Sequence, residues 1–386
     1  MDRHTWLSGQ LRAARAQTDG LFGLLAPGQL YVRPIAERHR LVFYLGHLEA
    51  FDRNLLARHL GIDRPLHVSW DELFARGIDP PVGKAAADRV SDWPGEPEVR
   101  AYVAAAREWV EGHLRAIEPD VLQMALEHRL MHAETLAYLL HGLPPEAKFP
   151  GKPPSPGGEA PPNPWVTVRA SRVRMGAPEG AFGWDNEHPG HDLDLPPFQI
   201  KHHKLTHAEY LAFVADGGPV PPFWQRSGDH WHLRTFFGRV PLPLDHPVWV
   251  TWDQAAAYAE WQGNQLPTEA QWLAASQMST SEPDRDNYDF RSFDTCPVPS
   301  PKVSQPPPRQ LTGNGWEWTR DVFRPFAGFQ AHPLYPGYSA DFFDDQHRIL
   351  KGAGPWTSRV LARPAFRNWF RPDYPHVHAG FRLVKD

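Results

Sequence analysis

The chain has 386 residues, more than one domain usually holds, and its 41% of hydrophobic residues is enough for two sizeable cores. Its 40 Lys and Arg are interspersed with 45 Asp and Glu at a net charge of −5, which gives no electrostatic footprint for nucleic acid. A single cysteine excludes an internal disulfide and a cysteine-based zinc site, whereas 21 histidines suit a metal held by imidazoles.

The sequence indicates neither a membrane span nor a secretory signal. It contains no run of 18 apolar residues, the length that a transmembrane helix needs. The N-terminal sequence MDRHTWLSGQLRAARAQ lacks the apolar segment of a signal peptide and predicts the start of a helix. We therefore expect a cytoplasmic protein that binds neither membrane nor nucleic acid.

Residues 1–143 are predicted to form a helical domain. Apolar residues recur at helical spacing in several segments, and four helices of this length favour a bundle. Asp120 is expected to cap the last helix, and Gly142 to stop it. The predicted helices lie within the first thirty residues and at 38–60, 97–117 and 120–141.

The segment 144–164, PPEAKFPGKPPSPGGEAPPNP, is predicted to be a linker because its Pro and Gly residues cannot sustain a helix or an interior strand. The residues 165–386 are expected to form a loop-rich α+β domain. Helices are predicted at 206–216, capped by Thr206, at 252–262, and after Pro267, where Thr268 caps and Glu269 lies in the first turn. Strands are predicted within 165–170, 198–203, 247–252, 348–353 and 379–384.

Three histidines of the helical domain suggest a metal site. His128 and His132 are four residues apart on one helix, so their side chains lie on the same face, which is also apolar. His47 lies near the middle of a second helix, and metal sites in bundles are built from facing helices. Such histidines can also be structural or exposed, and the residues alone leave both interpretations open. Three neutral imidazoles suit zinc, iron or copper.

Two parts of the sequence resemble the domains of a known enzyme family. The stretches FYLGHLEAFDRNLL and EHRLMHAETLAYLLH resemble the DinB-like four-helix metal domain of ergothioneine-type sulfoxide synthases and of the related selenoneine synthases. The remainder resembles the formylglycine-generating-enzyme (sulfatase-modifying factor) domain, which has a C-type-lectin-like fold. The matching pieces cover nearly the whole chain in the family's order, and they are MGAPEGAFGWDNEHPGHDLDLPPFQI, LPTEAQW, GNGWEWT, FRNW and AGFRLV.

The resemblance implies a two-domain enzyme whose active site lies at the domain junction. Such enzymes bind Fe(II) through three histidines, which match His47, His128 and His132 here. With dioxygen as co-substrate, they join a chalcogen donor to C2 of the imidazole of hercynine, the trimethylated betaine of histidine.

The resemblance also implies roles for residues of the second domain. Tyr335, in the element YPGY, would be the catalytic tyrosine, and Tyr338 a partner on the substrate side. Asn368 and Trp369 of FRNW would contact hercynine. A phenol can act as a general acid, an indole face attracts a trimethylammonium group, and an amide offers hydrogen-bond donors.

Each of these roles has a structural alternative. A tyrosine in a PGY turn, such as Tyr335, is often a packing residue. GNGWEWT is expected to be scaffolding, in which Glu317 satisfies local backbone groups, and LPTEAQW is expected to be a helix start.

Three positions depart from the pattern of the ergothioneine synthases. Phe370 and Tyr374 stand where an acid and an arginine grip a γ-glutamylcysteine donor, and Met131 stands where a glutamine often helps to hold hercynine. Two aromatic rings cannot replace an ion-pairing clamp, but they can stack on a sugar. We therefore expect selenoneine synthesis from a selenosugar, with cysteine or another thiol as the alternative donor.

Other functional classes are less consistent with the sequence. Formylglycine generation needs a pair of cysteines, and the chain has only Cys296. A non-catalytic binding module would leave the three histidines unexplained. A zinc-dependent thiol transferase of the DinB type would work without dioxygen and would not need Tyr335.

Overall fold

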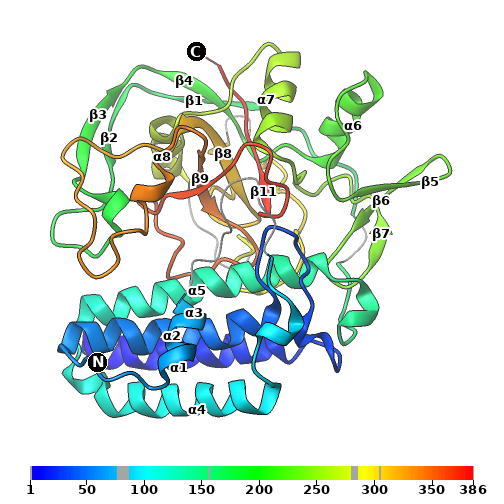
Figure 1. Cartoon of the computed structure of the whole chain (residues 1–386). Coiled ribbons are helices and arrows are strands. Elements are labelled where there is room, and N and C mark those ends of the chain that lie inside the picture. Colours follow the sequence, from blue (N-terminus) through cyan, green and yellow to red (C-terminus); the bar gives the residue numbers. More distant parts are fainter. Residues whose placement is uncertain (1, 76–86, 155–156, 280–285, 304–305, 386) are drawn as a thin grey trace. The chain divides into compact units, whose positions relative to one another are not determined.

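A computed structural model describes residues 2–75, 87–154, 157–279, 286–303 and 306–385. They divide into two compact units, Met1–Gly151 and Lys152–Asp386, and the division falls within the Pro-rich segment. Both units are drawn in Figure 1, and each is described here by itself. Within the described ranges, none of the helices is both long and apolar enough to cross a bilayer.

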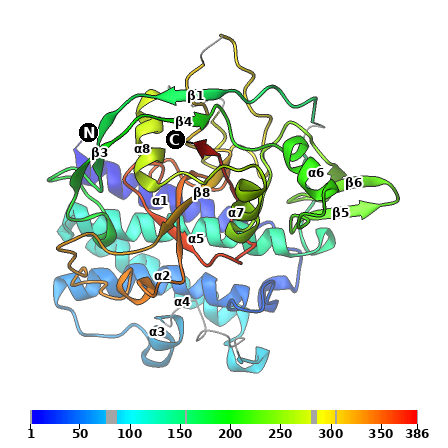
Figure 2. The ribbon, with the colours of Figure 1, turned by 90° about the horizontal axis from the view of Figure 1, so that it is seen from above.

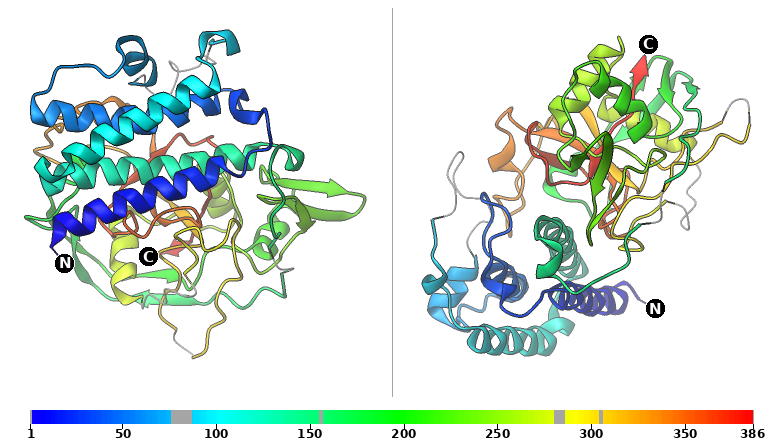
Figure 3. Two further views of the ribbon diagram at one scale, coloured as in Figure 1. Left: turned by 90° about the horizontal axis from the view of Figure 1, so that it is seen from below. Right: turned by 90° about the vertical axis from the view of Figure 1, so that its right-hand side faces the viewer.

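The described part of the first unit contains four long helices and a short one. α1 packs against α5, and α2 packs against both α4 and α5, so the predicted bundle is present. Figure 3 shows the long helices lying side by side. The helices are α1 (Arg3–Phe22), α2 (Leu41–Leu60), α3 (Val68–Ala75), α4 (Glu96–His113) and α5 (Pro119–Gly142).

The ends of the helices follow local chemistry. α5 ends at Gly142 as predicted, but the expectation that Asp120 caps its start is wrong, because Glu118 is the N-cap residue. Pro119 occupies the first helical position, where its missing N–H costs nothing, and Asp120 therefore lies inside the first turn. An acidic residue there still interacts favourably with the helix dipole.

The second unit combines small sheets with three helices in its described part. The largest sheet has the order β10-β9-β8-β11, with β11 parallel to β8 and the other pairs antiparallel. Its strands are β8 (Gly315–Val322), β9 (Arg348–Ala353), β10 (Asn368–Phe370) and β11 (Ala379–Gly380). In register, Trp316 faces Gly352 and Trp369 faces Ile349.

The remaining sheets are smaller. One has the order β1-β4-β12, and Figure 2 shows β1 and β4 running alongside each other. The other two are the hairpin β2-β3 and the meander β5-β6-β7. The strands are β1 (Trp165–Val168), β2 (Ser171–Met175), β3 (His191–Leu195), β4 (Phe198–Lys201), β5 (Trp224–Ser227), β6 (His230–Arg234), β7 (Arg239–Pro241) and β12 (Val384–Lys385).

The three helices of the second unit begin at threonines. They are α6 (His207–Ala215), α7 (Trp252–Trp261) and α8 (Glu269–Met278). Thr206 and Thr268 cap α6 and α8, as the sequence predicts, and Thr251 caps α7. Trp272 of α8 packs in a core cluster with apolar residues of β1, β2 and β4.

One predicted strand, at 247–252, is absent, and another, at 379–384, is interrupted. Residues 247–252 are all described, and none forms a strand, because Thr251 caps α7 and Trp252 already belongs to that helix. The segment 379–384 divides between β11 and β12. Arg382, between these strands, turns into the interior and pairs with Glu317 at 2.9 Å.

The expected role of Glu317 is also corrected. Its carboxylate accepts from Arg382 and lies 3.1 Å from the ammonium group of Lys204, and all three side chains are fully buried. The motif GNGWEWT therefore contributes to a central strand. Its glutamate pairs with two buried cations and does not serve as an acceptor for nearby backbone groups in the described part of the chain.

Candidate metal centre

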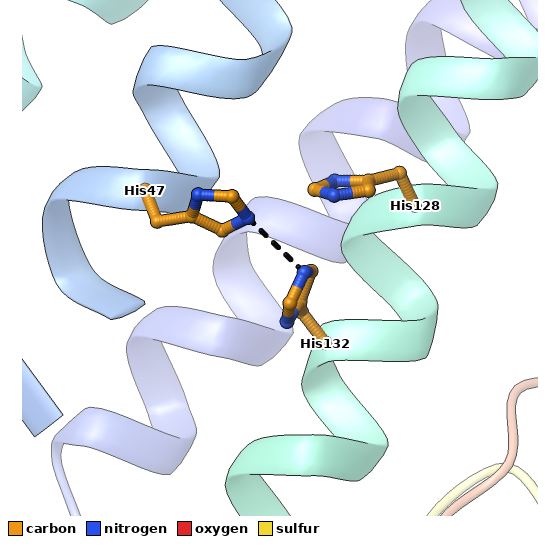
Figure 4. Close-up of side chains that lie close together, drawn as sticks. All are labelled: His47, His128 and His132. Atoms are coloured by element: carbon orange, nitrogen blue, oxygen red, sulfur yellow. Dashed lines mark hydrogen bonds between the residues drawn. The ribbon is translucent and has the colours of Figure 1, made fainter. Parts of the chain in front are cut away.

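Three histidines of the first unit gather between two neighbouring helices. α2 carries His47, and α5 carries His128 and His132 on one face, as their spacing predicts. Each of the three offers a ring nitrogen, and these nitrogens all lie within 4.8 Å of one another (Figure 4). The side chains are buried, with 6%, 3% and 6% of their surface exposed, respectively.

The ring of His47 is held by a backbone acceptor. Its Nδ1–H donates to the carbonyl oxygen of Phe74 at 2.6 Å. Since the proton is on Nδ1, the lone pair is on Nε2. That Nε2 lies 3.2 Å from Nε2 of His132, the contact that is dashed in Figure 4. In the metal-free state, His132 can donate its Nε2–H to His47, and a metal ion would take the place of that shared proton.

Aromatic rings of α2 form the walls of the cluster. Phe43 stacks on His47, with the ring centroids 4.8 Å apart, and Phe51 stacks on His128, with the planes inclined by 9°. Burial lowers the pKa of His47 to about 4 and lowers the pKa values of His128 and His132 well below the usual range of histidine. All three imidazoles are therefore neutral at pH 7 and can donate electron pairs to a cation.

The donor set fits a divalent transition metal. Neutral imidazoles are ligands for zinc, iron and copper, and the 3.2 Å between the two Nε2 atoms suits two ligands that each lie about 2.1 Å from one ion. Among the described residues, no Asp, Glu or Cys joins this cluster. The set is thus three histidines from two helices, and it matches the residues that the sequence singled out.

In the second unit, three of the predicted residues lie in one aromatic cluster. Tyr338 stacks on Trp184 with their centroids 4.0 Å apart, and it meets Trp369 edge-on at 5.3 Å. The ring of Tyr335 lies 5.7 Å from that of Tyr338. Burial, with a smaller contribution from Asp341, raises the pKa of Tyr335 to about 12. The phenol therefore keeps its proton at neutral pH.

Comparisons with known proteins agree with this two-part architecture. Residues 154–386 match the sulfatase-modifying factor enzyme 1-like domain, and residues 10–147 match the DinB superfamily. The hercynine oxygenase of Mycobacterium tuberculosis is 30% identical over 332 residues, which cover 74% of this chain and 77% of that protein. The chain belongs to the ergothioneine-type sulfoxide synthase family.

Two further members of this sulfoxide synthase family align over most of the chain. The hercynine oxygenase of Mycolicibacterium thermoresistibile is 28% identical over 399 residues, which cover 90% of this chain and 87% of that protein. Ergothioneine biosynthesis protein 1 of Neurospora crassa is 26% identical over 491 residues, which cover 94% of this chain but 56% of that protein. The chain thus spans about half the length of the fungal relative.

The remaining predicted residues have distinct surroundings. Asn368 is half-buried on β10, and its side-chain oxygen accepts from the backbone N–H of Trp369 at 2.9 Å. Phe370 and Tyr374 stack on each other with centroids 4.8 Å apart and planes inclined by 12°. Met131 is half-buried on α5, directly before His132 in the chain.

Two contributors to these clusters were not predicted from the sequence. Trp184 forms one wall of the tyrosine cluster, and its place in the stretch GWDNE, within a piece that resembles the family, was the only available signal. Phe74 contributes a backbone carbonyl to His47, and a pattern of side chains does not indicate which backbone group accepts a hydrogen bond.

Proposed function

We propose that this protein is a dioxygen-dependent, iron-containing enzyme that joins the sulfur of a small thiol to C2 of hercynine and forms a sulfoxide. The observation that carries the proposal is the convergence of three buried, neutral imidazoles in a chain of this family. The relatives named hercynine oxygenase and ergothioneine biosynthesis protein 1 support hercynine as the substrate.

The same relatives favour a thiol donor over the selenosugar that the aromatic replacements predicted. Within the thiols, the loss of an ion-pairing clamp at Phe370 and Tyr374 argues against γ-glutamylcysteine. Their stacked rings carry no charge and offer one hydroxyl, so they suit a smaller donor such as cysteine. A selenosugar is kept as a parallel substrate in the test below.

The overall reaction balances without another oxidant. One thiol R–SH, one hercynine C2–H and one O2 give one sulfoxide R–S(=O)–C2 and one water. Iron(II) held by His47, His128 and His132 would supply the site at which dioxygen is activated. The apolar rings of Phe43 and Phe51 stack on two of these imidazoles and shield them from bulk water.

The aromatic cluster of the second unit suits the other needs of the reaction. Tyr335 holds a proton at neutral pH and can deliver it while one oxygen atom of O2 becomes water. The faces of Trp369 and Tyr338 can attract the trimethylammonium group of hercynine by cation–π interaction. The amide of Asn368 can donate to the carboxylate or imidazole of hercynine.

The competing activities differ from the proposed one in the cysteines or the dioxygen that they need. Formylglycine generation needs two cysteines, and burial raises the pKa of the single thiol, Cys296, to about 11, so it is protonated rather than ready to bind a metal. A zinc-dependent thiol transferase would use the same three histidines but would need no dioxygen.

The proposal is tested by loading the protein with Fe(II) under anaerobic conditions and adding hercynine with cysteine, γ-glutamylcysteine or a selenosugar in parallel. Products are read by mass spectrometry with and without dioxygen, and the His132→Ala variant serves as the control. We expect a cysteine-derived sulfoxide that depends on dioxygen and iron. Products that form equally well without dioxygen, or no hercynine adduct with any donor, contradict the proposal.

A further inference from the structure

Gly46, the residue directly before His47 in α2, lies against the ring of Phe74 in α3. A Cβ atom built on Gly46 would collide with Cε1, Cδ1 and Cζ of that ring, at separations that real Cβ atoms essentially never show. The ring is fully buried, with 0% of its surface exposed, so it has no free space into which it can move. The close approach of α3 to α2 at this point therefore requires glycine.

The same approach brings a backbone acceptor to the metal centre. Phe74 lies in α3, one residue before the end of the part of this helix that the structure describes. Its oxygen accepts the Nδ1–H of His47 at 2.6 Å, so this contact gives the Nδ1 side of the buried imidazole a hydrogen-bond partner. The buried Nδ1–H of His47 would bear the cost of burial without this acceptor if the contact were lost.

This contact also selects the tautomer of His47. A proton on Nδ1 leaves the electron pair on Nε2, and that atom faces His132. A ligand histidine is commonly fixed in this way by a hydrogen bond from its other ring nitrogen, and loss of such a partner weakens metal binding about 10–100-fold. His47 is thus prepared for metal binding before any ion arrives.

We propose that Gly46 and Phe74 are positioning residues of the metal centre. The space left by the missing side chain of Gly46 admits the Phe74 ring, and this packing places the Phe74 carbonyl where it fixes the orientation and tautomer of His47. The inference rests on the proposed function, because that function assigns His47 as a metal ligand, but it goes further by naming what prepares the ligand.

The test compares Gly46→Ala with Gly112→Ala in the full chain. Gly112 is also a helical glycine, in α4, and a Cβ atom there would meet nothing within 4 Å. Both variants replace a helical glycine with alanine, and only one disturbs Phe74. The measurements are anaerobic titrations with Fe(II) and Co(II), and the ¹⁵N chemical shifts of the histidine ring nitrogens in the metal-free protein.

We expect Gly46→Ala to weaken binding of both metals about 10–100-fold and to change the His47 signals away from a pure Nδ1–H tautomer. Gly112→Ala should retain the wild-type affinity and signals. The double variant Gly46→Ala/Phe74→Ala removes all three ring atoms that collide but keeps the backbone carbonyl. It should recover part of the lost affinity, whereas general damage to the bundle would add up in the double variant.

The outcomes separate this inference from the proposed function. If the wild-type protein binds neither metal, the proposed function fails, and the ¹⁵N signals of the metal-free protein still decide whether Gly46 sets the tautomer. If the wild-type protein binds metal, and Gly46→Ala binds it within twofold with unchanged His47 signals, the positioning role is overturned. Affinity that is lost equally in Gly112→Ala overturns it as well.

Discussion

Arg129 of α5 donates to the carboxylate of Asp52 of α2 across 2.6 Å, and both side chains are completely buried in the bundle. The same guanidinium lies 2.9 Å from Glu49 and donates to the carbonyl oxygen of Leu48 at 3.0 Å. Arg129 directly follows His128 in the chain, and Leu48 directly follows His47. The two helices that carry the histidine cluster are therefore joined by a buried ion-pair network beside that cluster.

Replacing Arg129 with Met should destabilise the bundle strongly. The change leaves two buried carboxylates without their central cation, and removal of one partner of a buried pair costs about 3–5 kcal/mol. The matched control is Arg100→Met, which breaks the exposed ion pair of Arg100 with Glu96 on α4 and should cost less than about 1 kcal/mol. Denaturant unfolding, with hydrogen exchange of α2 and α5 peptides to locate the effect, gives the comparison. Similar losses in both variants would contradict it.

The hydroxyl of Tyr335 is expected to serve chemistry rather than folding. Tyr335→Phe should retain hercynine affinity and stability but reduce sulfoxide formation about 10²–10⁴-fold, the usual contribution of a general acid. Tyr210→Phe is the control, because it removes the hydroxyl of a fully buried tyrosine, one that donates to the Pro219 carbonyl. Single-turnover product formation is the measurement. An unchanged rate and product profile in Tyr335→Phe removes its proposed role.

Trp369 is expected to contribute to recognition of the trimethylammonium group. Its ring stacks on Phe323 at 4.3 Å with the planes inclined by 7°, so its position is well supported. A cation–π contact contributes about 0.5–2 kcal/mol, so Trp369→Leu should weaken hercynine binding about 2–30-fold and histidine binding less. Trp261→Leu, at a position that is 38% exposed, should change neither affinity. Equal losses of affinity for hercynine and for histidine in Trp369→Leu would show that the indole does not contact the trimethylammonium group.

The second unit should lose stability in mild acid, partly through His246. Burial lowers the pKa of this fully enclosed histidine to about 4, although Asp245 beside it acts in the opposite direction. Because the folded-state pKa is below the unfolded value of about 6.5, the unfolded chain binds more protons between these values. The contribution of His246 is therefore complete above pH 6.5 and falls as the pH decreases toward 4. At pH 5 the loss amounts to about 2 kcal/mol.

His246→Gln should reduce this difference between pH 7.5 and pH 5, measured by urea unfolding of the second unit. The same replacement at His230, which is exposed on β6, should leave the pH dependence of stability as it is in the wild type. A pH dependence that is identical in all three proteins would show that His246 does not contribute.

Periodic apolar patterns predicted the parts of the structure that are determined locally. The bundle helices, the threonine caps of α6 and α8, and the pairing of His128 with His132 all follow from spacing along one segment. The sequence also places Met131 directly before His132, and Tyr335 in the element YPGY. The chemical roles of Met131 and Tyr335 came only from the family resemblance.

Features that depend on contacts between distant segments were not predictable. The segment 247–252 has the apolar and β-branched residues of a strand, but Thr251 forms a capping box with Gln254, a local signal that the strand prediction passed over. Glu317 was expected to bond locally, and its partners Lys204 and Arg382 are 113 and 65 positions away in the chain. The contact between Phe74 and His47 involves a backbone oxygen, which the sequence cannot reveal.

The three-histidine iron site is tested most directly by an anaerobic Fe(II) titration of the wild-type protein and of the His47→Ala, His128→Ala and His132→Ala variants, with His113→Ala of α4 as the control. We expect one equivalent of iron in the wild type and in His113→Ala, and loss of tight binding in each of the other three while both units stay folded. One equivalent of iron retained by any of those three variants would contradict this expectation.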